Sequence, residues 1–552
     1  MSRASMSLST SALVAALAVA TLAGAHASLR GASADGPVVD TADGPLRGAV
    51  EGAAHAFRGV PFAAPPVGAL RWADPAPVTP WTETRDATQW TKGCPQICDM
   101  PPGTCPDQWA EDCLYLNVFR PANAAAGAKL PVMFWIPGGR YLQGAAGMPL
   151  YDGSTLATEQ NIIVVTTDYR LGALGFAVVG GKGSWGIRDQ IAALKWVQTN
   201  IAAFGGDPAA VTIAGQSAGG CSVGTLLVTP LAKGLFSRAI MESNPMSLRL
   251  KEGGEDSTTA DKLATGMGCK DGNDLDCLRA VDVNKLMQAA GDAQGHFFLS
   301  HPLDMFLPWS PYVGGDVLPD QPITLIKNNR GVNAVPLMLG NMKNDAWMFV
   351  YSALGSKLTQ VEYRALITYI FGLSRESKLE DLYTTGSIFK RNDTRPALSL
   401  LGTDYIFRCP NRLVADTWRA QFPSMPAYVY QFNHAPSSGN TWGANFSFCA
   451  GVACHGSEIP FLFASFDAFP GATSTPAEDA LGKTLRAYWG SFIRGEAPSA
   501  PGAAAWPQWT GTPGSADGGS TMLLDVAGKA GVTTALHSQA CDWWDEQGYT
   551  FG

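Results

Sequence analysis

Charged side chains are scarce in this chain and make up only 16% of its 552 residues. Acidic residues outnumber basic ones, 47 to 39, so the formal net charge is -8. Runs of like charge are absent as well. A protein without a basic surplus lacks the electrostatic attraction for phosphate backbones on which nucleic-acid binding depends. We therefore predict no nucleic-acid partner.

Long hydrophobic runs and internal repeats are also missing. The longest apolar stretch, residues 12–25, is shorter than the ~20 residues that a helix needs to cross a bilayer. It follows Arg3 and precedes an A-x-A sequence at residues 25–27, which is the pattern of a cleaved secretory signal. We predict a signal peptide at residues 1–27 and a secreted product with no stable membrane anchor. The absence of repeats excludes solenoids and propellers.

Cysteine is sparse too, but several of its eleven residues are close in sequence. Such grouping is typical of small disulfide loops in exported proteins, and the odd number leaves one residue unpaired or bridged to a partner. Zinc binding is the alternative for C-x3-C at 94–98 and C-x7-C at 105–113. No second pair at finger spacing and no nearby histidine support it, so we predict no metal. Asn392 and Asn445 begin sequons and are candidate glycosylation sites in an exported chain.

Apolar runs of strand length alternate with helical patterns along the body of the chain. Residues 130–136 (LPVMFWI) and 161–168 (NIIVVTTD) read as buried strands, and 189–201 has helical spacing. This alternation indicates a mostly parallel sheet with helices on both faces. No linker rich in Pro or Ser interrupts residues 28–552, so we predict one large α/β domain there.

The pattern G-x-S-x-G occurs twice, at residues 215–219 and 220–224. The first match directly follows the strand pattern 211–214 and opens a helix of small residues. A sharp turn from strand to helix exposes the serine hydroxyl above a sheet, where it can attack an acyl group. The second match lies one turn inside that helix. We therefore predict Ser217 as a nucleophile and Ser222 as a packing residue.

An acyl-transfer nucleophile needs an oxyanion hole, because the tetrahedral intermediate carries negative charge on the former carbonyl oxygen. The amide of Ala218, next to the nucleophile, is one expected donor. The turn Gly138-Gly139-Arg140 follows the strand that ends at Ile136, where the other donors belong. We predict that the amides of Gly139 and Arg140 take this role. An ordinary tight turn is the alternative.

Segments along nearly the whole mature chain resemble the type-B carboxylesterases, which include the cholinesterases. They are residues 56–68 (AFRGVPFAAPPVG), 70–72 (LRW), 111–118 (EDCLYLNV), 189–208, 235–240 (LFSRAI) and 506–509 (WPQW). The resemblance implies the α/β-hydrolase fold, with a central mostly parallel sheet flanked by helices. It also implies hydrolysis of small-molecule esters with no metal or organic cofactor.

In this fold the chain order is serine, acid, histidine. His455, in the sequence CHGSEIPF, is similar to the catalytic histidine segment of the family. Asp345 ends the sequence GNMKND after the strand pattern 335–339, where most relatives have Glu. Asp performs the task equally well in many hydrolases, because the acid orients the imidazole and stabilises its cation. The other histidines that follow Ser217 are predicted to be structural hydrogen-bonders: His296, His301, His434 and His537.

The resemblance also implies a set of disulfides, which are Cys94–Cys113, Cys269–Cys277 and Cys409–Cys541. Two further pairs are expected as additions, Cys98–Cys105 and Cys449–Cys454. Cys221 is then left as a buried free thiol. Two structural ion pairs are expected, Arg71 with Glu111 and Arg170 with Asp189.

Two positions beside the predicted nucleophile depart from relatives. Gln216 stands where the cholinesterases have an anionic Glu, and with Gly138 it is predicted to face the substrate. Arg140 stands in a loop that commonly reads His-Gly-Gly-Gly. Its guanidinium is bulky and always charged. Either it turns away to pair with a carboxylate, or it borders the pocket and favours esters that carry a nearby negative charge.

The sequence thus predicts a secreted serine esterase with the triad Ser217, Asp345 and His455. Two alternatives stay open. The chain could be a lipase for longer acyl esters, with the loop between Cys94 and Cys113 as a lid. It could also be a retired family member that serves as a binding or adhesion module, because a fold alone does not imply chemistry.

The two serine patterns give a direct test. Ser217→Ala is expected to abolish hydrolysis of a 4-nitrophenyl ester, whereas Ser222→Ala keeps most of it, because only Ser217 occupies the strand-to-helix turn. The rates are measured by release of 4-nitrophenol from the purified variants. If both variants remain active, another residue is the nucleophile.

Overall fold

The computed structural model describes residues 36–549 except 126, 295–301, 385–391 and 513–518. The predicted signal peptide, His296 and His301 lie outside these residues. From Gly36 onward the chain forms one compact unit. Among the described helices, none combines the length and the apolar character needed to cross a membrane.

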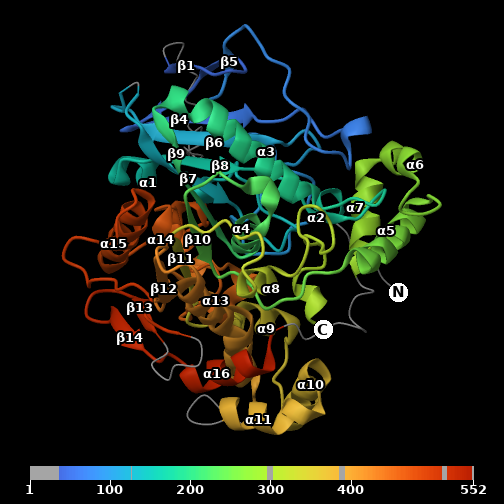
Figure 1. Ribbon diagram of the computed structural model, residues 1–552, viewed down its shortest axis with the longest axis vertical. Helices are drawn as coiled ribbons and strands as arrows, with labels where there is room; N and C mark the ends of the chain where they lie inside the picture. Colours follow the sequence, from blue (N-terminus) through green and yellow to red (C-terminus); the bar gives the residue numbers. More distant parts are fainter. Residues whose placement is uncertain (1–35, 126, 295–301, 385–391, 513–518, 550–552) are drawn as a thin grey trace, which may run out of the picture. The chain divides into compact units, whose positions relative to one another are not determined.

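Eleven strands of the described chain form one large sheet in the order β14-β13-β12-β11-β10-β9-β7-β8-β6-β4-β3 (Figure 1). The six neighbouring pairs from β13 to β8 are parallel, and both edges of the sheet are antiparallel. Three strands, β1, β2 and β5, form a separate small sheet. The strands are β1 Val38–Asp40, β2 Pro45–Arg47, β3 Ala49–Glu51, β4 Ala54–Pro61, β5 Arg85–Asp86, β6 Tyr115–Pro121, β7 Leu130–Ile136, β8 Ile163–Thr167, β9 Gly206–Gln216, β10 Arg238–Glu242, β11 Leu337–Met342, β12 Ala427–Phe432, β13 Ser520–Leu524 and β14 Gly531–Thr534.

Helices connect these strands, and several of them, among them α1, α3, α4, α13 and α15, pack on the sheet (Figure 1). They are α1 Ser154–Gln160, α2 Gly172–Phe176, α3 Trp185–Asn200, α4 Ala218–Val228, α5 Gly253–Met267, α6 Leu275–Ala280, α7 Val283–Gln294, α8 Pro322–Lys327, α9 Trp347–Ala353, α10 Gln360–Phe371, α11 Leu373–Tyr383, α12 Arg395–Thr403, α13 Cys409–Gln421, α14 Ile459–Leu462, α15 Pro476–Ile493 and α16 Ser538–Gln547. A short π-helix, η8 Asp404–Arg408, joins α12 to α13.

Strand β7 shows why the central strands are apolar throughout. Val132 and Phe134 belong to the buried cluster that contains side chains of α3, α4 and α13. The alternate residues, Met133 and Trp135, belong to the cluster that contains side chains of α1, α14 and α15. Successive side chains of a strand point to opposite faces, so a strand covered on both faces needs apolar residues at every position.

Two predicted elements are longer than their sequence patterns. Strand β9 starts at Gly206 rather than residue 211, because its early residues pair with β7 across an irregularity in register. Helix α3 starts at Trp185, since its first turn already buries Trp185 and Ile187. Neither difference moves the strand-to-helix turn at Ser217.

Both expected ion pairs are present. The Arg71 guanidinium donates to both carboxylate oxygens of Glu111, at 2.8 and 2.7 Å. Arg170 forms the same forked contact with Asp189 at 2.8 and 2.7 Å, and both side chains are almost fully buried. The amide of Arg170 also donates to Asp189, at 3.0 Å. This second pair ties the segment after β8 to helix α3.

All five expected disulfides are formed in the structure: Cys94–Cys113, Cys98–Cys105, Cys269–Cys277, Cys409–Cys541 and Cys449–Cys454. The widest of them spans 132 residues and joins the start of α13 to α16. In the chain-entropy account, a loop of this length stabilises the folded state by roughly 4–5 kcal/mol. Cys221 is free and buried.

The buried ion pair predicts a large loss of stability when one partner is removed. Asp189→Ala is expected to lower the free energy of unfolding by about 3–5 kcal/mol, because it leaves the Arg170 charge buried and unpaired. Urea denaturation measures the change. The control is Asp320→Ala, which breaks the exposed 2.9 Å pair with Arg330 and should lower stability by under about 1 kcal/mol. Equal losses in the two variants would contradict the argument.

Candidate active site

Ser217 occupies a sharp turn between strand β9 and helix α4. Its backbone has φ 60° and ψ -122°, a conformation that residues other than glycine rarely adopt. The turn is held by the Ser217 amide, which donates to the carbonyl of Glu242 on β10 at 2.9 Å. Gly219 makes the turn possible, because a Cβ there would lie 2.0 Å from the Ile136 carbonyl oxygen. Strand, turn and helix therefore present the serine as the sequence pattern predicts.

The glycine loop after β7 packs directly against this turn. A Cβ on Gly138 would lie 2.5 Å from the Gln216 carbonyl oxygen and 3.1 Å from the Ser217 Cβ. Gly139 has φ 114°, and Arg140 follows in the left-handed region with φ 60°. Ala218 is the first residue of α4, so its amide has no partner within the helix. The loop and the helix start thus meet at Ser217, where an oxyanion hole requires them.

Asp345 and His455 are in direct contact. Asp345 lies in the turn after β11, and its Oδ1 is 2.5 Å from the His455 Nδ1. Its other oxygen accepts from the Ser243 hydroxyl at 2.8 Å and from the Met342 amide at 2.9 Å. Both Asp345 and His455 are buried. The two donors fix the carboxylate, and the carboxylate fixes the imidazole ring.

The second nitrogen of His455 faces the nucleophile's neighbour. The Gln216 amide nitrogen lies 3.2 Å from the His455 Nε2. An ionised carboxylate can only accept and an amide NH2 can only donate, so Nδ1 carries the proton and Nε2 accepts. This tautomer is the one that can take a proton from a serine. Among the described residues, the Ser217 hydroxyl itself has no hydrogen-bond partner.

Two aromatic rings pack on the imidazole. The ring centroid of Phe349, on α9, is 4.9 Å from that of His455, and the Phe407 centroid is 5.4 Å away. Phe407 belongs to the π-helix η8, and the next residue is Arg408. The buried Arg408 side chain donates to the Lys343 carbonyl at 3.3 Å and pairs with Asp404. The π-helix therefore supports both the ring of His455 and the turn that carries Asp345.

A buried pair of glutamates lies beside the same site. Burial raises the pKa of Glu242 to about 8, although the Trp489 indole donates to its carboxyl at 2.7 Å. Burial, followed by the nearby Glu242, holds the pKa of Glu458 well above its ordinary value. Two carboxyl groups this close cannot both ionise easily, so the pair retains a proton at neutral pH. Less negative charge therefore lies beside His455 than two ionised glutamates would supply.

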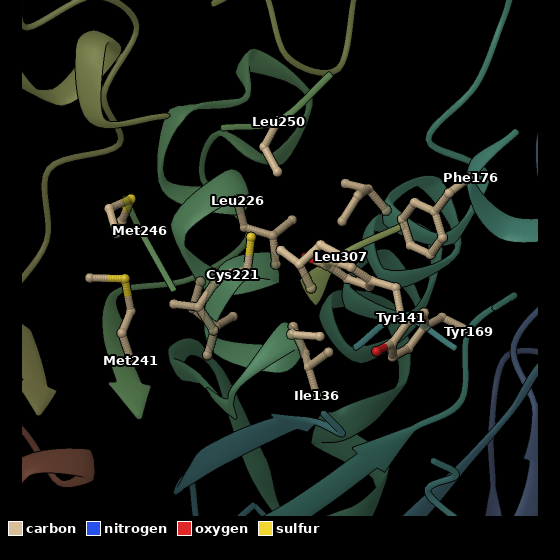
Figure 2. Packing of buried hydrophobic residues seen from close by; sticks show 14 of the residues in the cluster. Ile136, Tyr141, Tyr169, Phe176, Cys221, Leu226, Met241, Met246, Leu250 and Leu307 are labelled. Carbon is tan, nitrogen blue, oxygen red and sulfur yellow. The ribbon is translucent and has the colours of Figure 1, made fainter. Parts of the chain in front are cut away.

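Ser222 lies inside helix α4 as a packing residue. Its hydroxyl is fully buried, donates to the Tyr141 hydroxyl at 3.2 Å and accepts from the Gln190 amide at 3.0 Å. Figure 2 shows the Cys221 sulfur beside Leu226 within the apolar packing of this helix. Burial raises the pKa of the Cys221 thiol to about 11. Ser222 is thus held inside the helix by two hydrogen bonds, and the Cys221 thiol stays protonated at neutral pH.

Arg140 fulfils parts of both expectations. It pairs with Asp99 at 3.4 Å, as expected for a side chain that turns away, and its Nε donates to the Phe306 carbonyl at 3.2 Å. It also lines an apolar cavity of about 510 Å³ that includes Phe349. A smaller cavity of about 60 Å³ lies over Gly138, Gly139 and His455, and Met100 and Pro101 of the Cys94–Cys113 loop border it.

The two other described histidines that follow Ser217 in the chain hold structural contacts. His434 lies between Glu478 and Asp525, 3.1 Å from an oxygen of each. His537 contacts Asp404 at 3.0 Å, and burial lowers the pKa of His537 to about 3. Such a histidine stays neutral. Neither ring is in contact with Ser217 or Asp345.

Several residues of the site were not predicted from the sequence. Glu242 and Ser243 lie far along the chain from Arg408, and only the fold brings all three to Asp345 and His455. Glu242 ends strand β10 and Ser243 follows it, at the edge of the sheet where the nucleophile lies. A search for polar residues at the carboxyl ends of neighbouring parallel strands would have found these two.

Comparisons with known proteins agree with this geometry. The model of the "Carboxylesterase family" matches residues 35–544. The chain is 36% identical over 510 residues to the "Crystal protein" of Dictyostelium discoideum, covering 92% of this chain and 90% of that protein. It is 35% identical over 532 residues to the liver carboxylesterase of Sus scrofa, covering 89% and 91%. A solved structure titled "PNB esterase" matches with a TM-score of 0.76 and 31% identity, covering 91% of this chain and 98% of that one.

The matched region spans the sheet, both helix layers and all the residues gathered around Ser217. The identity exceeds 30% over nine tenths of the chain in the first of these relatives. These findings confirm the predicted α/β-hydrolase fold with its mixed, mostly parallel sheet in a single domain. The chain belongs to the carboxylesterase family.

Proposed function

We propose that the protein is a secreted serine hydrolase of carboxylic esters with the triad Ser217, Asp345 and His455. The observation that carries this proposal is the 2.5 Å contact between Asp345 and His455, with the opposite ring nitrogen directed towards the Gln216–Ser217 turn. A structural histidine would not need a buried carboxylate on one nitrogen and a strained serine turn beside the other.

In the first half-reaction, the Ser217 oxygen attacks the ester carbonyl while the His455 Nε2 takes its proton. The Gln216 amide donates to the Nε2 lone pair, so it has to move away before Nε2 can accept the serine proton. Asp345 stabilises the imidazolium and keeps Nδ1 protonated. The amides of Gly139, Arg140 and Ala218 receive the oxyanion, where preformed donors act without reorganisation.

The first half-reaction ends when the imidazolium gives its proton to the departing alcohol, which leaves an acyl-enzyme on Ser217. In the second half-reaction, His455 takes a proton from a water molecule that attacks the acyl carbonyl. His455 then returns this proton to the Ser217 oxygen as the acid leaves. Apart from the ester and water, the chemistry uses only groups of this chain.

Secretion and glycosylation belong to the same proposal. A signal-like segment at residues 1–27 and five disulfides are typical of an exported protein. Asn392 and Asn445 are both exposed, so each sequon is accessible to a glycan. The Cys94–Cys113 loop borders the small cavity over His455, a position suited to a rim or lid.

An organophosphate separates an esterase from a retired binding module. We expect diethyl 4-nitrophenyl phosphate to phosphorylate Ser217 stoichiometrically and to stop ester hydrolysis, because only an activated serine displaces 4-nitrophenol. Mass spectrometry of the peptide that contains Ser217 locates the adduct, and Ser217→Ala is the control. A protein that neither reacts nor hydrolyses esters would be a binding module.

Asp345→Asn is expected to lower kcat for a neutral ester by on the order of 10⁴-fold, because an amide at this position favours the wrong tautomer of His455. Steady-state kinetics measures the loss. The matched control is Asp416→Asn, since Asp416 is also buried but bonds the Trp509 indole at 2.7 Å and has no contact with His455. Near-normal turnover of Asp345→Asn would assign the acid to another carboxylate.

A further inference from the structure

The cavity of about 510 Å³ beside the active site is large enough for a small-molecule ligand. Apolar side chains of α9, α10 and α12 line most of it, among them Val350, Ile370 and Leu401. Tyr369 also lines it and is 54% exposed, so the cavity extends to the protein surface. An apolar ligand, or the apolar part of one, would be desolvated by this lining.

Arg140 is the one charged residue among the described residues that line this cavity. The Arg140 Nε donates to the carbonyl of Phe306, which also lines the cavity. This hydrogen bond holds the Arg140 side chain beside Phe306 at the cavity wall. The Arg140 side chain is 23% exposed. Burial lowers its pKa, but the ordinary pKa of a guanidinium is so high that the group stays charged. The cavity thus combines apolar walls with a single fixed cation.

Asp99, one of the groups that contact the Arg140 guanidinium, is on the solvent side. Asp99 is 60% exposed and its oxygen lies 3.4 Å from the guanidinium. Exposed pairs of this kind contribute little, because water and salt compete with them. A carboxylate that arrives with an apolar chain would meet Arg140 in a drier setting, where charge-assisted hydrogen bonds are stronger. It can therefore share or replace the contact with Asp99.

We propose that this cavity binds an amphipathic monocarboxylate, with its alkyl chain against the apolar lining and its carboxylate on Arg140. The ligand is an unbranched fatty-acid anion of medium length. Both halves of the site are needed, since the walls recognise the chain and the guanidinium recognises the charge. This binding goes beyond ester hydrolysis and does not require Ser217.

The site is coupled to the catalytic residues through two contacts. Phe349 lines the cavity and packs on the His455 ring, and Arg140 directly follows Gly139 in the predicted oxyanion loop. The acid that an esterase releases from a medium-chain ester has the chemistry of the proposed ligand. Occupation of the cavity is therefore expected to inhibit hydrolysis of such esters.

Calorimetric titration of octanoate into the Ser217→Ala protein tests the binding without any turnover. Arg140→Met keeps an apolar side chain of similar length but removes the charge, and should weaken octanoate binding about tenfold or more. Ile370→Trp fills the cavity from α10 and should weaken it similarly. Arg330→Met removes an exposed surface charge elsewhere and should leave it unchanged. Thermal melting confirms that each variant is folded.

Octan-1-ol provides the neutral ligand of matched chain length. We expect it to bind more weakly than octanoate to the parent and to be insensitive to Arg140→Met. Equal affinity for the acid and the alcohol, or octanoate binding that survives Arg140→Met, would overturn the role of Arg140. Binding that survives Ile370→Trp would place the ligand outside the cavity. These titrations use Ser217→Ala, so their result does not depend on whether the parent protein hydrolyses esters.

Discussion

The backbone around Ser217 is crowded to the limit that glycine allows, and the rest of the site depends on this crowding. Helix α4 starts so close to β7 that a Cβ on Gly219 would lie 2.0 Å from the Ile136 carbonyl oxygen. Gly138 approaches the Gln216–Ser217 turn in the same way. Because three elements meet within these distances, Ser217 is held in a strained conformation and the glycine loop lies beside it. A side chain at either Gly138 or Gly219 would prevent this arrangement.

Electrostatics then sets which groups around the imidazole are charged. Asp345 accepts three hydrogen bonds, from His455, Ser243 and Met342, and these hold its carboxyl group in place. Glu242 and Glu458 are buried nearby and keep a proton, because burial raises the pKa of both. The buried Arg408 guanidinium anchors the Lys343 carbonyl next to the acid turn. The two glutamates therefore add less negative charge near His455 than two ionised carboxylates would.

The positions at which the sequence departs from the family pattern lie at the acid, beside the nucleophile and in the glycine loop. Asp345 is shorter than the Glu of most relatives, yet it reaches His455 at 2.5 Å. Gln216 brings a neutral amide, not a carboxylate, to the His455 Nε2. Arg140 adds a cation between the exposed Asp99 and an apolar cavity. These exchanges keep the contact between Asp345 and His455 and change the charge that an incoming ligand meets.

The sequence by itself determined the fold class, the position of the Ser217 turn and the pairing of Asp345 with His455. These features are local or ordered along the chain: strand-length apolar runs, glycines around a serine, and segments shared with a family. It did not determine the Glu242–Glu458 pair, the support from Ser243 and Arg408, or the cavity behind Phe349. Those groups are separated by up to hundreds of residues, and only the parallel sheet aligns the ends of β10, β11 and β12. Arg140 shows the boundary well, because two directions for its side chain were open from the sequence alone. Its side chain pairs with Asp99 and also lines the cavity. Both contacts depend on the tertiary structure, because Asp99, Phe306 and helices α9 and α10 are brought to Arg140 only when the chain folds.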